Sequence, residues 1–113
     1  MSPSPLARLA SLETKAHRAP WVIEQDQEDP LSVFINDHEA EEGSECIAHM
    51  GWYPPKPKGA MTDASLVCTL RNNLPLLLDL WRAASAWETK GETAGPALAN
   101  AVRTINSRFT FPH

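Results

Sequence analysis

The residues best suited to bind a metal ion lie together in one acidic segment. His38 stands between Asp37 and Glu39. Cys46 and His49 have the C-x-x-H spacing of half a zinc site, but no second pair completes it. The carboxylates do not follow the alternating ligand pattern of a calcium loop. On a strand, residues three apart point to opposite faces, which separates the cysteine from the histidine. We therefore expect no metal ion and no other cofactor.

Nucleophilic catalysis needs a serine or cysteine beside a base, and the sequence has no pattern that builds one. No serine or cysteine lies in the turn sequence of a nucleophile elbow, and no glycine-rich loop is present to hold a phosphate. The four histidines are scattered singly along the chain. We expect no catalytic residues and predict that the protein is not an enzyme.

Charge is distributed unevenly along the chain. Nine acidic residues and no Lys or Arg lie between Ala19 and Pro55, which gives this segment a charge of −9 and the remainder +5. Such a field attracts basic protein surfaces and repels nucleic acid. The alternative is an acidic surface that only keeps the protein soluble. The predicted acidic partner-binding face consists of Glu28, Asp29, Asp37, Glu39, Glu41, Glu42 and Glu45.

Aromatic residues mark a second candidate contact. Trp52 and Tyr53 stand beside the proline run of residues 51–60, which cannot form a helix or a central strand. This segment predicts an extended connection between two halves of the chain. Next to such a connection the two rings are expected to be exposed and available to a partner.

The N-terminal half predicts one helix followed by a small sheet. Ser4-Pro5 is a helix-start signal, and apolar residues three or four apart follow it, which predicts a helix over 4–17. Three short runs rich in β-branched and aromatic residues come next, separated by turn sequences. They are Trp21–Asp26, Leu31–Asp37 and Cys46–Met50. Short strands joined in this way pair antiparallel, so residues 20–50 predict an acidic three-stranded meander.

The C-terminal half predicts helices. Thr62 is a suitable N-cap, and Pro75 interrupts the apolar pattern, so residues 62–89 predict a kinked or broken helix. Lys90-Gly91 can end it, and a last helix over 96–109 follows Gly95.

Two apolar stripes run along the helix predicted at 62–89. The first consists of Leu66, Val67, Leu70, Leu74, Leu77, Leu78, Trp81 and Ala84. The second consists of Leu76, Leu80, Ala83 and Trp87. Together they cover more than half of the circumference, so the helix needs cover on two sides. The sheet is expected on one side, and on the other either the last helix or another subunit. We predict a homodimer on the second stripe, because a two-fold contact covers the same patch on both subunits.

Three segments resemble a loosely defined family of small phage and prophage accessory proteins. The first is LARLASLETKAHRAPW, the second is Cys46-Ile47-Ala48, and the third joins Asp63–Val67 to Arg71–Leu78. The third segment is similar to the family's "DA-x-L-I … RN-x-LP-x-LL" signature. The resemblance covers about residues 6 to 88 and implies an origin in a phage genome and a fold, but no reaction and no site residues.

These observations predict one α+β domain over residues 1–113. It consists of an N-terminal helix, a three-stranded antiparallel meander, and two to three helices packed on one sheet face. No run of residues is long and apolar enough to cross a membrane, and no signal peptide is evident, so we expect a cytoplasmic protein. The predicted function is non-enzymatic binding and modulation of a host protein with a basic surface, with no direct nucleic-acid contact. Its specific version is a counter-defence inhibitor of the anti-CRISPR kind. The alternative is a self-associating structural or assembly module without a host target.

Overall fold

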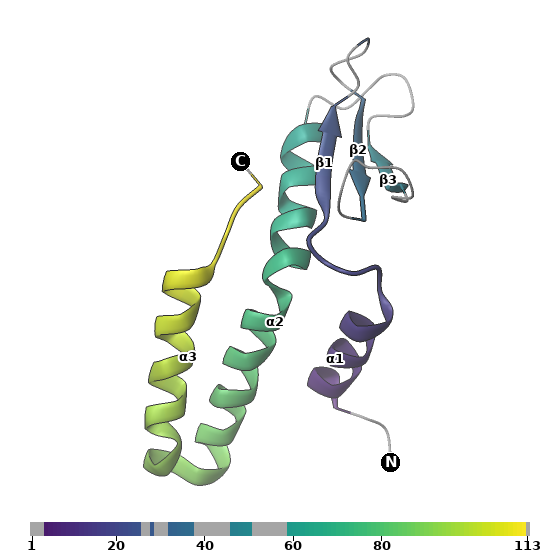
Figure 1. Cartoon of the computed structure of the whole chain (residues 1–113). Coiled ribbons are helices and arrows are strands. Elements are labelled where there is room, and N and C mark those ends of the chain that lie inside the picture. The colour runs from purple at the N-terminus through teal and green to yellow at the C-terminus, as the bar shows by residue number, and fades with distance from the viewer. Residues whose placement is uncertain (1–3, 26–27, 29–31, 38–45, 51–58, 113) are drawn as a thin grey trace. The chain divides into compact units, whose positions relative to one another are not determined.

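A computed structural model describes residues 4–25, 28, 32–37, 46–50 and 59–112. Figure 1 labels the helices and strands, and the chain divides into two units. The helical unit comprises Met1–Ala16 and Asn73–Thr110, and the sheet unit comprises His17–Asn72 and Phe111–His113. The long helix α2 contributes its first part to the sheet unit and its second part to the helical unit.

The N-terminal helix α1 spans Pro5–Lys15 and begins as the sequence predicts. The Ser4 hydroxyl accepts a hydrogen bond from the backbone amide of Ala7 at 3.1 Å, and Pro5 occupies the first turn, where no amide is needed. The helix ends two residues earlier than expected. Its half-buried positions recur three or four apart, as in an amphipathic helix that lies against other elements of its unit.

The predicted meander is confirmed. Strand β1 spans Val22–Gln25, β2 spans Val33–Asn36 and β3 spans Cys46–Met50. The strands pair antiparallel in the order β1-β2-β3, with an irregularity in the β2–β3 register after Ile35. Val33 and Ile35 alternate along β2 toward one face of the sheet, and both are almost fully buried.

The first three turns of α2, which spans Ala60–Lys90, cover this face of the sheet (Figure 1). The helix residues in the core are small, namely Ala60, Ala64 and Cys68 at steps of four. The bulk of the core comes from the sheet side, where Trp21, Ile23, Ile47, Ala48 and Met50 pack around the same cluster. We expected one of the two apolar stripes to face the sheet, and this expectation is wrong. The small residues face it instead, because their short side chains let the helix approach the sheet closely.

The predicted break or kink at Pro75 is not a break, because α2 is helical from residue 60 through residue 90. The predicted start at Thr62 is also wrong, since the Asp63 amide already bonds the Gly59 carbonyl at 2.8 Å, one turn earlier. The end is confirmed: α2 stops at Lys90, and Gly91 has the positive φ of 60° that favours glycine after a helix.

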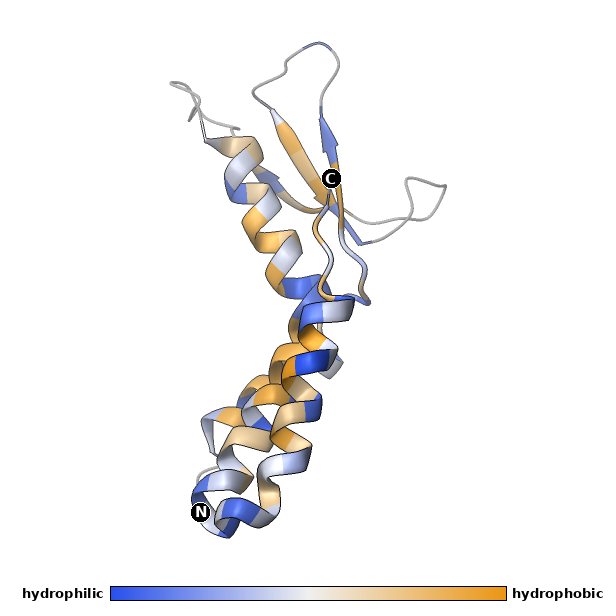
Figure 2. Ribbon diagram, turned by 90° about the vertical axis from the view of Figure 1, so that its left-hand side faces the viewer, coloured by the Kyte–Doolittle hydropathy of each residue, from blue (hydrophilic) through white to orange (hydrophobic). Residues whose placement is uncertain are grey.

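Helix α3, Gly95–Arg108, follows α2 through a short 3-10 helix, η1, at Gly91–Ala94. The chain is thus helical from residue 60 to residue 108, and the turn at η1 brings α3 alongside the second part of α2 (Figures 1 and 2). Helix α3 and the second part of α2 both belong to the helical unit. The expectation that two to three helices pack on one sheet face is therefore wrong. Among the described core residues, those that cover the sheet come from the first part of α2.

Candidate protein-binding surface

The backbone of Trp21, just before β1, is held by the side chain of Asn72. The Trp21 amide donates to Asn72 Oδ1 at 2.6 Å, and Asn72 Nδ2 donates to the Trp21 carbonyl at 2.9 Å. The side-chain amide therefore pairs with the chain much as a neighbouring strand would. This contact fixes the position of α2 along the sheet within the sheet unit.

Arg71 supports the same segment from beneath the Trp21 ring. Its guanidinium carbon lies 5.5 Å from the ring centroid, and Nη2 donates to the His17 carbonyl at 2.9 Å. The indole Nε1 donates to the same carbonyl at 3.0 Å. Because Arg71 is only 8% exposed, its charge is committed to this contact rather than displayed to a partner.

Asn73 makes a similar contact inside the helical unit. Its Nδ2 donates to the Thr110 carbonyl at 2.7 Å, and its Oδ1 accepts from the Thr110 amide at 2.9 Å. Neither this contact nor that of Asn72 is among the predictions made from the sequence. The signal in the sequence is two adjacent asparagines inside an apolar helix. A buried asparagine side chain needs a hydrogen-bonding partner, so such a pair indicates contacts with other segments.

Opposite the sheet, the first part of α2 carries large apolar side chains that remain accessible. Leu66 is 59% exposed, Leu70 49% and Val67 38%. Their spacing of three and four residues places them on one side of the helix, and we call these three residues the α2 outer stripe. They form the beginning of the first stripe found in the sequence. Because the small residues on the other side of the helix pack closely on the sheet, these three side chains point outward.

Of the seven residues predicted to form the acidic face, the structure describes two. Glu28 is exposed and Asp37 is half-buried, and both lie in the sheet unit. The remaining five lie outside the described residues, as do Trp52 and Tyr53. Glu24, on β1, is also exposed and accepts a hydrogen bond from Asn36 Nδ2 at 2.8 Å, so its carboxylate is anchored at the sheet surface.

The second stripe lies toward α3 of the same chain. Leu76, Leu80 and Ala83 are half-buried, whereas Trp87 is 43% exposed. A methyl group added at Gly95 would lie 3.3 Å from the Trp87 ring, so this ring packs over the start of α3. Leu76 and Ala83 also line a groove of about 400 Å³ beside α3. The homodimer stays a prediction, but the stripe it would use is covered in part within one chain.

That groove has an apolar floor and a polar rim. Ala97 and Ala101 of α3 face the two α2 residues on its floor, and Asp79 and Arg82 form an ion pair at its edge, with nitrogen and oxygen 3.1 Å apart. Both partners of the pair are more than half exposed, so it contributes well under 1 kcal/mol, roughly the level of a surface pair. Neither its shape nor its lining identifies a ligand.

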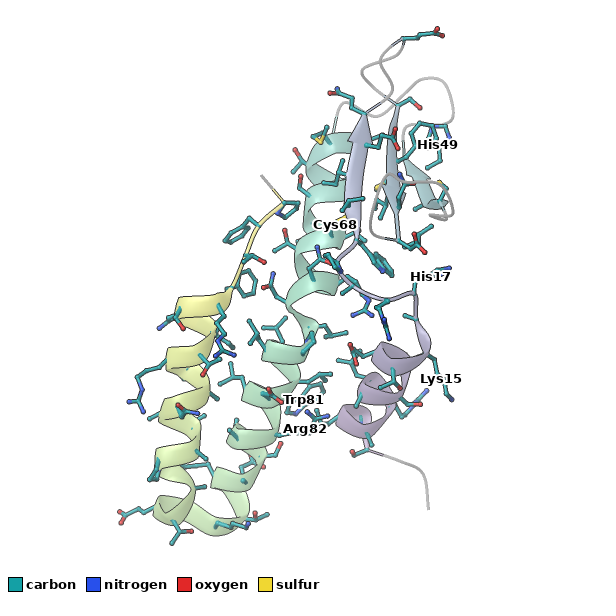
Figure 3. The ribbon with its side chains drawn as sticks, viewed as in Figure 1. Lys15, His17, His49, Cys68, Trp81 and Arg82 are labelled. Carbon is teal, nitrogen blue, oxygen red and sulfur yellow. The ribbon has the colours of Figure 1, made fainter. Side chains whose placement is uncertain are left out.

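Two of the residues considered for metal binding, Cys46 and His49, have other contacts. His49, on β3 (Figure 3), stacks on Phe34 of β2, with ring centroids 4.1 Å apart. Its Nε2 is hydrogen-bonded to the Ser32 hydroxyl. The exposed Cys46 thiol donates to the Ala48 carbonyl at 3.4 Å. Within the described ranges, no three His, Cys, Asp or Glu side chains gather where they could hold a metal ion. His38 lies outside those ranges.

Comparison with protein-family models, with curated protein sequences and with solved structures gave no match. Among the helices that the structure describes, none has both the length and the apolar content needed to cross a bilayer. The candidate protein-binding surface consists of the α2 outer stripe and the exposed carboxylates of the sheet unit, such as Glu24 and Glu28.

Proposed function

We propose that the protein is a non-enzymatic interaction protein of phage origin that binds a host protein with a basic surface through its sheet unit. The observation that carries this proposal is the division of charge between the units. The sheet unit has ten acidic and four basic residues, a formal charge of −6, whereas the helical unit has four acidic and six basic residues, a charge of +2. A field of this kind steers basic partners toward one part of the molecule.

The specific form of the proposal is a counter-defence inhibitor that acts in the host cytoplasm. A dense group of carboxylates presents negative charge to a protein surface that normally receives the phosphates of a nucleic acid. Occupying that surface blocks the nucleic acid without any reaction. The phage-like segments that include Asp63–Val67 and Arg71–Leu78 support the origin, and the exposed Glu24 and Glu28 support the location.

The test is capture of partners from a bacterial lysate by the tagged full-length chain at about 50 and about 500 mM salt, since salt screens exposed charges. One variant carries Gln at four sheet-unit positions, Glu39, Glu41, Glu42 and Glu45. The matched control neutralises the four helical-unit carboxylates, Glu13, Asp79, Glu88 and Glu92. We expect nucleic-acid-handling proteins to bind the wild type and the control at low salt only, and not the sheet-unit variant. A partner set without such proteins, or binding indifferent to salt, contradicts the proposal.

Self-association is the alternative, and exposed apolar side chains of the helical unit favour it. Leu12 is 64% exposed, and Trp81, Trp87 and Val102 are each 42 to 43% exposed. The solution mass separates the two functions. A tight dimer that captures nothing supports a structural or assembly module built on the second stripe, whereas a monomer with a basic partner supports the interaction protein.

A further inference from the structure

The strongest unassigned feature of the sheet unit is the α2 outer stripe. Buried apolar side chains normally stabilise a helix on a sheet, yet here the helix residues in the core are Ala60, Ala64 and Cys68. The leucines stand outside, with Leu66 and Leu70 at 59% and 49% exposure. Folding of this unit therefore leaves the leucines of the first part of α2 largely exposed, and a row of such residues at one face is typical of a contact surface.

Along residues 59–70, the charge beside the stripe is negative or absent. Asp63 is exposed one turn before Leu66, and residues 59–70 contain no Lys or Arg. The next cation along the helix, Arg71, is buried against Trp21. A partner segment that covers the stripe therefore meets apolar side chains bordered by the Asp63 carboxylate, in a unit whose formal charge is −6.

The chemistry of the stripe also selects the conformation of the partner. Leucine and valine side chains offer no hydrogen-bonding group, so an extended segment laid over them would bury backbone amides and carbonyls without partners. An α-helix bonds its own backbone and avoids this cost. In addition, Leu66 and Leu70 form a ridge with a spacing of four, which packs into the grooves of a second helix.

We propose that the α2 outer stripe is the docking surface for an amphipathic helix of the partner, whose apolar face is flanked by Lys and Arg. This inference rests on the proposed function and adds to it the residues in contact and the structure of the bound segment. The apolar face of the partner helix covers Leu66, Val67 and Leu70. Its flanking cations lie beside Asp63, the exposed carboxylate one turn before Leu66.

The experiment measures binding of synthetic helices to the full-length chain by fluorescence anisotropy. The probe is a labelled 18-residue helix with Leu along one face and Lys on the other. One comparison peptide has the same composition in an order that forms no apolar face, and the other has Glu in place of Lys. We expect the Leu/Lys helix to bind at least tenfold more tightly than either comparison peptide. Equal binding of all three, or no binding, overturns the proposal.

Two double variants locate the contact. Leu66→Ser with Leu70→Ser removes the stripe, and Leu12→Ser with Val102→Ser changes two similarly exposed apolar residues of the helical unit. We expect at least a tenfold loss of affinity in the first variant and less than a twofold change in the second. Amide shifts of the wild-type chain on titration with the Leu/Lys helix give a readout that does not depend on the variants, and they are expected to centre on residues 61–71.

Other outcomes separate this inference from the proposed function. The first variant could still bind the Leu/Lys helix, while binding is abolished in the variant with Gln at Glu39, Glu41, Glu42 and Glu45. In that case the docking surface is not the α2 outer stripe, and the acidic face remains the binding site. If the wild type sediments as a dimer that the first variant converts to a monomer, the occupant is a second copy of the chain, which overturns the inference. Failure of the lysate capture with the peptide results intact overturns the host function alone.

Discussion

Asn72 and Trp21, 51 residues apart, are joined by two hydrogen bonds between one side-chain amide and one stretch of backbone. The amide donates to the Trp21 carbonyl and accepts from the Trp21 amide, at 2.9 and 2.6 Å. A single helix residue thereby aligns β1 with α2 and, through α2, orients the outer stripe away from the sheet. The neighbouring residue makes the same kind of contact to a different segment, Thr110.

Removing the Asn72 amide should destabilise the sheet unit. Asn72→Ala loses both hydrogen bonds and leaves two backbone groups of Trp21 without their partner, which we expect to lower the free energy of unfolding by about 2 kcal/mol. Urea denaturation followed by tryptophan fluorescence measures the change. Asn100→Ala, at an exposed position of α3, is the matched control and should have little effect. Equal effects of the two substitutions would show that the Asn72 contact contributes nothing specific.

Asn73→Ala should release the C-terminal segment from the helical unit. The Asn73 side chain is 1% exposed, so its loss leaves Thr110 unpaired and a small cavity behind, at a cost of about 1 to 3 kcal/mol. Hydrogen exchange should accelerate at the Thr110 amide more than in the middle of α3. Protection of Thr110 as strong in the variant as in the wild type is the contrary result.

A methyl group at Gly95 is expected to be unfavourable while the Trp87 ring packs over this position. Gly95→Ala places a methyl group 3.3 Å from the ring, so the ring must shift, and we expect a loss of about 1 kcal/mol in place of the gain that alanine normally brings to a helix. In the background Trp87→Ala the same substitution should become neutral or stabilising. Thermal unfolding of the four proteins measures the coupling. Additive effects would place the Trp87 ring elsewhere.

The two thiols should differ in reactivity. Burial raises the pKa of the Cys68 thiol, which lies in the core beside the sheet (Figure 3), whereas Cys46 is exposed. Under native conditions near pH 8, iodoacetamide should modify one thiol per chain, at Cys46, because Cys68 is both inaccessible and protonated. Mass spectrometry of peptides identifies the site. Modification of Cys68 at a comparable rate contradicts the burial.

The same pKa shift predicts how stability depends on pH. The folded state holds the Cys68 proton more tightly than the unfolded chain does. The contribution of this thiol to the free energy of unfolding is therefore fully present below the ordinary pKa of a thiol. As the pH rises past that value, the unfolded chain releases its proton first and the free energy of unfolding falls, until the raised pKa is reached. Denaturation of Cys46→Ser as a function of pH should show this fall, and adding Cys68→Ala should abolish it.

Local signals in the sequence determined the first elements of the fold. Ser4-Pro5 correctly predicted the start of α1, because an N-cap and a proline at the first position depend only on the backbone amides of the first helical turn. Short runs of β-branched and aromatic residues between turn sequences predicted β1, β2 and β3, and the short connections between them predicted antiparallel pairing. Gly91 ended α2 because the left-handed conformation after a helix favours glycine. The uneven distribution of charge, on which the proposed partner-binding unit depends, can also be read directly from the sequence.

Only the tertiary structure decided which side of α2 faces the sheet. Hydropathy marks Leu66 and Leu70 as the residues to bury, but the sheet supplies its own bulk through Val33 and Ile35, so the closest fit is to the small side chains. The structure also shows α2 continuing through Pro75, which local rules identify as a helix breaker. Asn72 and Asn73 were ambiguous for the same reason, since their partners lie 51 and 37 residues away and no local pattern names them.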